Sequence, residues 1–222
     1  MKKTFYCRSG EYQNPVKIII YWMLVFTSMT ILIALAACDD STKQITQLPD
    51  DAVILAFGDS LTHGTGAEKN ESYPVILEQS INRKVINAGI PGELSIHGLK
   101  RLPQLLEQHQ PELLILCHGG NDLLQKKNLA EAETNIRQMI ALAVNKDIPV
   151  ILLGVPKPGL FLNDAKLYSN ISESTDITYI PNLIAEILSD ASMKSDPVHP
   201  NEAGYKKMAL ALASALRDSG AL

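Results

Sequence analysis

A serine near the start of the chain and an aspartate and histidine near its end have types and spacings suited to nucleophilic chemistry. Ser60 stands in the segment Gly58-Asp59-Ser60-Leu61, directly after an apolar run. Asp196 and His199 stand three residues apart. At that offset the carboxylate can reach Nδ1 of the imidazole and leave Nε2 free for a serine hydroxyl. The pattern predicts acyl transfer, with Ser60 as nucleophile, His199 as base and Asp196 orienting the base.

Each of these segments also has an ordinary structural interpretation. Gly-Asp-Ser is typical of a turn or a helix N-cap. Asp196-Pro197 is a common turn, and His199 can be a surface residue before a helix that Pro200 and Asn201 help to start. The catalytic interpretation therefore depends on whether the segments come together in the fold.

Two further loops carry groups that can donate hydrogen bonds. Residues 87–93 follow the second apolar run and contain Gly92, and the segment Gly119-Gly120-Asn121-Asp122 follows the third. Loops at the carboxyl ends of parallel strands meet at one edge of a sheet. We expect an oxyanion hole made by the backbone N–H groups of Ser60 and Gly92 and the side-chain amide of Asn121.

Other polar residues near these loops have simpler predicted roles. Asp59 and Asp122 are expected to brace their loops through hydrogen bonds to the backbone. His118 can line the pocket, although a structural histidine with satisfied hydrogen bonds is the preferred interpretation.

The segments that must position these loops alternate between strand and helix patterns. Short apolar runs predict strands at 52–57, 84–87, 112–118, 149–154 and 177–180, and helical periodicity predicts helices at 73–81, 96–108, 129–145 and 201–217. Strands that alternate with helices favour a parallel α/β sandwich. The loop predicted at 155–170 contains Leu160-Phe161-Leu162, an apolar triplet that can receive an acyl chain or pack beneath its own loop.

Taken together, the four blocks around Ser60, Gly92, Asn121 and His199 resemble the SGNH hydrolase family, also called GDSL esterases and lipases. The blocks occur in the family's order across residues 51–217, and the nearest likeness is to the bacterial periplasmic thioesterase, arylesterase and lysophospholipase type. The resemblance implies a three-layer αβα sandwich around a parallel sheet of about five strands, the flavodoxin-like SGNH hydrolase fold.

Carried over by position, the resemblance makes Ser60, Asp196 and His199 catalytic and Ser60, Gly92 and Asn121 oxyanion donors. The segments Leu105–Pro111 and Gly119–Asp122 are similar to stretches shared by that periplasmic type. Pro91 and His63 depart from the family's usual residues near the site.

Composition limits the function in other ways. The chain has 222 residues and a net charge of −4. Residues 1–37 carry four basic residues and one acidic residue, which leaves −7 on the remainder. An acidic body of this kind argues against a nucleic-acid partner. No metal is implied, because the histidines form no ligand-spaced cluster, and no cofactor is expected. Cys117 ends an apolar run and is expected to be a small buried hydrophobe.

The first fifty residues predict export and membrane attachment. Residues 18–37 form a nearly continuous apolar run without charge, which ends Leu35-Ala36-Ala37-Cys38. This ending resembles a bacterial lipobox, in which the cysteine is lipidated. Asp39 then resembles an inner-membrane retention signal, which places the protein on the periplasmic face. The alternative is an uncleaved transmembrane helix, since twenty residues can span ~30 Å of hydrocarbon.

The predicted organisation is therefore a signal or anchor segment at 1–37, a lipidated cysteine with a polar linker at 38–50, and a hydrolase domain at 51–222. The expected substrates are small acyl esters or thioesters, including lysophospholipids. Two other functions remain open, a carbohydrate O-acetylesterase and a lipoprotein binding module without catalysis.

Overall fold

The computed structural model describes residues 43–159 and 162–222. Five parallel strands form one sheet in the order β2-β1-β3-β4-β5. These strands are β1 (Val53–Gly58), β2 (Lys84–Gly89), β3 (Leu113–Cys117), β4 (Val150–Leu153) and β5 (Thr178–Ile180). All five were predicted, with ends that differ by no more than two residues. The predicted lipidation site, Cys38, and the apolar run before it lie outside the described residues.

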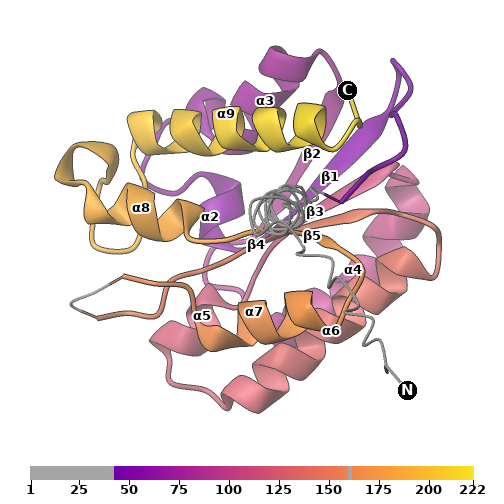
Figure 1. Cartoon of the computed structure of the whole chain (residues 1–222). Coiled ribbons are helices and arrows are strands. Elements are labelled where there is room, and N and C mark those ends of the chain that lie inside the picture. The colour runs from indigo at the N-terminus through magenta and orange to yellow at the C-terminus, as the bar shows by residue number, and fades with distance from the viewer. Residues whose placement is uncertain (1–42, 160–161) are drawn as a thin grey trace, which may run out of the picture. The chain divides into compact units, whose positions relative to one another are not determined.

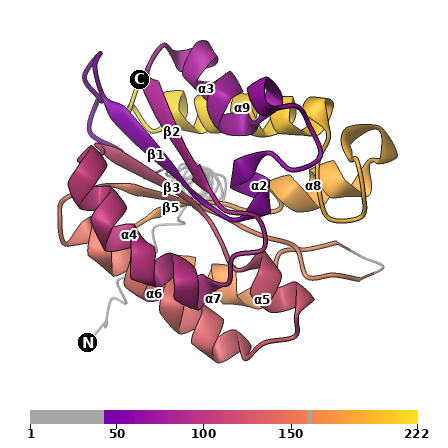
Figure 2. The same ribbon diagram turned by 180° about the vertical axis from the view of Figure 1, so that it is seen from behind.

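Helices cover both faces of this sheet. Figures 1 and 2 show α3 (Tyr73–Ile81), α8 (Leu183–Ser189) and α9 (Glu202–Asp218) on one face. The other face carries α4 (Ser95–His109), α6 (Leu129–Val144) and α7 (Lys166–Glu173). The expected three-layer αβα sandwich is confirmed.

Burial explains why the central strands are apolar along their whole length. Every residue of β3 and β4 is buried, as is every residue of β1 after Val53. Strands covered by helices on both faces need apolar residues at every position. The edge strand β2 has only Val85 buried. Cys117 is fully buried and its burial raises the pKa of its thiol well above the usual range, which agrees with a structural role.

The strand order places a topological switch point between β1 and β3. The chain runs from β1 outward to β2 and then returns across β1 to form β3. In open parallel sheets, ligands bind outside the carboxyl ends of the strands at such a point. Ser60 follows β1 and the segment 119–122 follows β3, so the fold brings these two loops to that point.

The segment predicted as a loop at 155–170 is partly helical, and this part of the prediction is wrong. Helix α7 begins at Lys166 and continues to Glu173. Its sequence is rich in serine and asparagine, which have modest helix propensity. Leu167, Tyr168 and Ile171 are nevertheless buried, at the spacing that one helix face presents to a core. The helix therefore forms because these side chains pack against the core, and not because of its local helix propensity.

Residues ahead of β1 also pack onto the domain. Ile45 and Leu48 are buried. Their N–H groups donate to the carbonyls of Ser219 and Ala221, 2.9 and 2.8 Å away. Part of the segment expected as a linker therefore lies against the C-terminus of the chain. Within residues 43–159 and 162–222, no helix is long and apolar enough to cross a membrane.

Candidate active site

Ser60 is presented by a tight turn between β1 and a short helix, α2 (Ser60–His63). Gly58 ends the strand where a side chain would overlap the carbonyl of Cys117 on β3, so the two backbones can approach this closely only with glycine here. Asp59 is the N-cap of α2, and its Oδ1 accepts a 3.1 Å hydrogen bond from the N–H of Leu61. Asp59 is thus the N-cap, and Ser60, the next residue of the same turn, is the proposed nucleophile.

The serine from the front of the domain meets the histidine from its rear. Ser60 Oγ lies 3.0 Å from His199 Nε2. On the other side of the ring, His199 Nδ1 lies 2.7 Å from Asp196 Oδ2. A carboxylate can only accept a hydrogen bond, so Nδ1 carries the proton and Nε2 has a lone pair facing the serine hydroxyl. This arrangement can deprotonate Ser60 as it attacks a carbonyl carbon.

The carboxylate of Asp196 is held in its ionised form. Burial acts to raise the pKa of Asp196, but hydrogen bonds from the His199 ring and from backbone N–H groups outweigh it and lower the pKa. The backbone donors are Val198 and His199, 2.8 and 2.9 Å from Oδ1. Both carboxylate oxygens are therefore occupied, one by the backbone and one by the ring.

The loop that carries this pair is fixed at both ends. An antiparallel bridge joins Lys194 to Pro200, and the N–H of Ser195 donates to the carbonyl of His199 at 3.0 Å. Asn201 then caps α9, its side chain accepting a hydrogen bond from the N–H of Gly204. The imidazole thus projects from a closed turn directly before a long helix.

Two of the three residues expected to donate to an oxyanion line the cleft. Asn121 lines the same cleft as Ser60, whereas Gly92 is not among the cleft's lining residues. The Asn121 amide nitrogen Nδ2 donates to the Glu93 carbonyl at 3.1 Å and to Asp59 Oδ2 at 3.3 Å. Within the described chain, the N–H groups of Ser60 and Gly92 have no hydrogen-bond acceptor. The structure thus supplies two free backbone donors and one amide that is already engaged.

A buried ionic network, which the sequence did not indicate, supports the Gly92 loop. The Glu93 carboxylate accepts from Arg101 Nε at 2.7 Å and lies 3.1 Å from His118 Nε2. Burial acts to raise the pKa of Glu93, but the hydrogen bonds of His118 and Arg101 outweigh it and hold the pKa at about 2. Arg101 also donates to the carbonyls of Gly58 and Ala88, at the ends of β1 and β2. No motif marks Arg101, because its role depends on contacts with distant parts of the chain.

The predicted bracing roles agree with the geometry. Asp59 and Asp122 are buried, and Asp122 accepts from the N–H and the hydroxyl of Ser95 at 2.9 and 2.8 Å. His118 is fully buried, and its Nδ1 accepts from the N–H of Gly119 at 2.9 Å. It is thus a structural histidine, as preferred from the sequence. His63 and Pro91 are exposed and lie outside the cleft lining.

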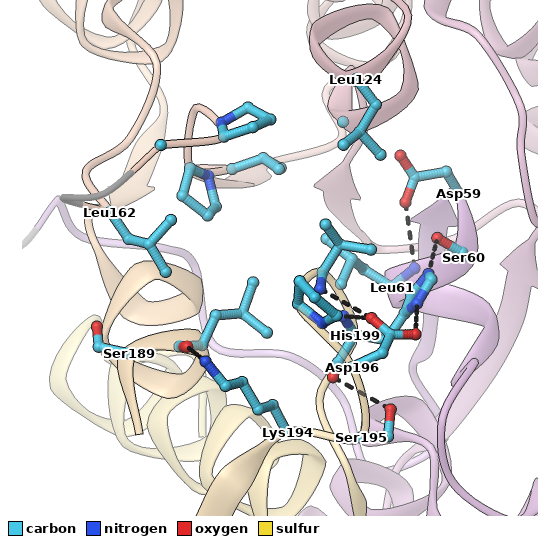
Figure 3. Close-up of a pocket in the computed structure, with 18 of the residues that line it drawn as sticks. Asp59, Ser60, Leu61, Leu124, Leu162, Ser189, Lys194, Ser195, Asp196 and His199 are labelled. Atoms are coloured by element: carbon cyan, nitrogen blue, oxygen red, sulfur yellow. Dashed lines mark hydrogen bonds and ion pairs between the residues drawn. The ribbon is translucent and has the colours of Figure 1, made fainter. Parts of the chain in front are cut away.

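A cleft of about 950 Å³ opens beside Ser60 and His199. Figure 3 shows Ser60 and Asp59 on one side, and Leu162 and Ser189 across from them. Much of the lining is apolar, supplied by Leu61, Leu124, Val155, Pro156, Pro158, Leu162, Leu188, Ala191, Pro197 and Val198. Of the predicted apolar triplet, Leu162 lines the cleft, and residues 160–161 lie outside the described chain. Among the described residues, no three histidine, cysteine or acidic side chains are grouped to hold a metal ion.

Comparison with known proteins gives consistent matches. The protein-family model described as "GDSL-like Lipase/Acylhydrolase family" matches residues 56–207 of this chain. Thioesterase 1/protease 1/lysophospholipase L1 of Escherichia coli K12 is 30% identical over 188 residues, which cover 81% of this chain and 85% of that protein. The arylesterase of Vibrio mimicus is 26% identical over 189 residues, with 80% and 90% covered.

Solved structures agree with these matches. The crystal structure of TesA superposes with a TM-score of 0.69 at 25% identity and covers 75% of this chain and 99% of its own. The SGNH-hydrolase family esterase AlinE4 gives a TM-score of 0.61 at 32% identity, with 78% and 98% covered.

Proposed function

This chain belongs to the GDSL-like lipase/acylhydrolase family, also known as SGNH hydrolases, and from that membership we infer that Ser60, His199 and Asp196 carry its chemistry. The chain is a serine esterase, that is, a carboxylic ester hydrolase. The observation that supports the three residues best is the pair of contacts at His199, 3.0 Å to Ser60 Oγ and 2.7 Å to Asp196 Oδ2.

The proposed cycle has two halves. His199 takes the Ser60 proton as Oγ attacks the acyl carbon, and then returns a proton to the leaving alcohol or thiol. A water molecule, deprotonated by the same imidazole, then hydrolyses the acyl-enzyme. Asp196 holds the ring in the required tautomer and stabilises the imidazolium that forms in each half.

The negative charge of the tetrahedral intermediate needs donors that are already in place. We assign the N–H groups of Ser60 and Gly92 and the amide of Asn121 to this role. The amide already contacts Asp59 and Glu93, so an oxyanion would have to share or replace one of these bonds. The 3.3 Å bond to Asp59 is the longer and the more easily displaced.

The cleft supports an acyl substrate with a hydrocarbon part. Leu124, Val155 and Leu162 present apolar surface beside the serine. The relatives named thioesterase, lysophospholipase and arylesterase suggest small thioesters, lysophospholipids and aryl esters as candidates. This apolar lining favours acyl esters over the polar acetylated sugars of an O-acetylesterase.

Replacing Ser60 tests the assignment. Purified Ser60→Ala should lose turnover of a chromogenic short-chain ester and labelling by a fluorophosphonate probe, while its thermal unfolding stays near that of the parent. Ser80→Ala, at an exposed position on α3, is the matched control and should keep both. Undiminished turnover by Ser60→Ala would end the assignment.

We further propose that the chain is exported and attached to the bacterial inner membrane on its periplasmic side. The apolar run at 18–37 and Cys38 support this proposal. Two or more acyl chains give stable attachment, whereas one gives marginal binding. Metabolic labelling with an alkyne fatty acid should mark the parent and not Cys38→Ala. Unlabelled protein in the membrane fraction would instead indicate an uncleaved helix.

A further inference from the structure

A lysine stands in the wall of the cleft, two residues before the aspartate of the proposed triad. Lys194 lines the cleft together with Ser189 and Ser195, and Figure 3 shows its side chain between them. Its backbone is fixed by the bridge to Pro200. Lys194 is thus held in the same closed turn as Asp196 and His199, and its position relative to the triad is set by that turn.

The ammonium group of Lys194 is only partly used. Its Nζ donates to the carbonyl of Leu188, 2.8 Å away near the end of α8. An ammonium has three donors, so two are left for another acceptor. Among the described residues, no carboxylate lies within ion-pair distance of Nζ.

The acidic groups nearby are committed to other partners. Asp190 lies near enough to Lys194 for their charges to interact, without forming an ion pair, and its Oδ1 accepts hydrogen bonds from the N–H and the hydroxyl of Ser192. Asp196 is paired with His199, and Asp59 accepts from Leu61 and Asn121. Lys194 is the one lysine or arginine in the described lining of the cleft, and no described carboxylate forms an ion pair with it.

The surroundings make this charge significant for binding. Lys194 is half-buried, and several of its neighbours in the cleft are apolar, including Leu188 and Ala191. A cation removed in part from water interacts more strongly with an anion than an exposed one does. The chain outside residues 1–37 carries a net charge of −7, which repels anions in general. A single cation in the wall of the cleft therefore opposes the net negative charge of the body at the place where we expect the substrate to bind.

We propose that Lys194 is a specificity residue that binds an anionic group, a phosphate or a carboxylate, on the ester or thioester substrate. The inference rests on the proposed function, because it concerns what the same cleft prefers to hydrolyse. Lys194 takes no part in the bond-breaking step. It contributes a charge-assisted hydrogen bond away from the scissile carbonyl.

Two matched substrate pairs test this role. In the first, butyryl coenzyme A and S-butyryl-N-acetylcysteamine share an acyl group, and only the coenzyme thioester carries phosphates. In the second, mono-4-nitrophenyl glutarate and 4-nitrophenyl valerate share a leaving group, and only the glutarate carries a carboxylate. The charge preference is the ratio of kcat/KM for the anionic member over the neutral member, measured for each protein.

Three variants separate charge from structure. Lys194→Gln removes the charge and keeps a donor for the Leu188 carbonyl, whereas Lys194→Arg keeps the charge. Lys207→Gln removes a charge of the same sign from α9, where Lys207 lies 3.4 Å from Glu186. We expect Lys194→Gln to lower the charge preference about tenfold in one pair or both. Lys194→Arg and Lys207→Gln should retain it.

The affected pair identifies the anion. A loss confined to the thioester pair indicates phosphate on the leaving group, and a loss confined to the glutarate pair indicates carboxylate on the acyl chain. An unchanged preference in both pairs, or an equal loss in Lys207→Gln, would overturn the proposal for Lys194. If the parent hydrolyses the neutral substrates in either case, the proposed function stands without it. If the parent hydrolyses none of the four, the function itself fails.

Discussion

The backbone carbonyl of Glu93 accepts a 3.1 Å hydrogen bond from the side-chain amide of Asn121. This contact joins the loop after β2 to α5 (Gly120–Leu124), the short helix that follows β3, directly beside Ser60. The carboxylate of the same Glu93 is held by Arg101 and His118. The position of the amide is therefore coupled to a buried ionic network on the far side of the loop.

Replacing Asn121 by alanine should lower kcat by about 10²–10³, the usual loss when one oxyanion donor is removed. KM should change much less, because the amide acts on charge that develops in the transition state. Steady-state kinetics on a short-chain ester measures both constants. Asn145→Ala removes an exposed amide at the end of α6 and should leave both near the parent values. A kcat within a few-fold of the parent in Asn121→Ala would exclude the amide as an oxyanion donor.

Replacing Arg101 by methionine should destabilise the fold by about 3 kcal/mol. The Glu93 side chain is 6% exposed, so loss of the guanidinium leaves a buried carboxylate without one of its two partners. Urea unfolding measures the loss. The double variant Arg101→Met with Glu93→Gln should lose less than the sum of the single losses, because the unpaired charge is then removed. Strict additivity would show that the two groups do not interact.

The depressed pKa of Glu93 predicts a defined loss of stability in acid. The folded pKa is about 2 and the ordinary value is 4.5, so the unfolded chain takes up the proton first as the pH falls. The stabilisation is therefore complete above about pH 4.5 and is lost progressively toward pH 2. A shift of this size corresponds to about 3 kcal/mol. The free energy of unfolding of the parent, measured between pH 2 and 6, should fall by about this amount as the pH is lowered.

Glu93→Gln provides the control for that titration. The glutamine cannot ionise, so the free energy of unfolding of this variant should change by about 3 kcal/mol less between pH 6 and pH 2 than that of the parent. A parent and a variant with parallel pH profiles would show that other carboxyl groups cause the acid loss.

The strands and the pairing of Asp196 with His199 were predictable because both depend on local sequence. Runs such as Leu113–Cys117 are apolar at every position, which indicates burial on both faces wherever they occur. Asp196 and His199 are three residues apart, so a single turn brings their side chains together. Ser60 joins them because parallel strands deliver their loops to one edge of the sheet. These predictions needed no knowledge of contacts between distant residues, except for the meeting of Ser60 with His199.

Features that depend on distant contacts were not predictable. Helix α7 has a polar sequence, and only the burial of Tyr168 and its neighbours against the core reveals it. Arg101 resembles an ordinary charged residue of an amphipathic helix, yet it also lies over the ring of Phe57, 4.1 Å from its centroid. The engagement of Asn121 by Asp59 and Glu93 likewise depends on three segments that come together only in the folded chain.

Replacing Asp196 by asparagine should lower kcat by about 10⁴ and leave the fold nearly as stable. The asparagine carbonyl can still accept from the N–H groups of Val198 and His199, as Oδ1 of the aspartate does. Its amide nitrogen would then face His199 Nδ1 as a donor, which requires the ring proton to move to Nε2. A protonated Nε2 cannot accept the proton of Ser60 Oγ, 3.0 Å away. The Asp196 side chain is 45% exposed, so the substitution buries no unpaired group. Measured kcat and thermal unfolding separate the two effects, and turnover within tenfold of the parent would show that Asp196 does not orient the histidine.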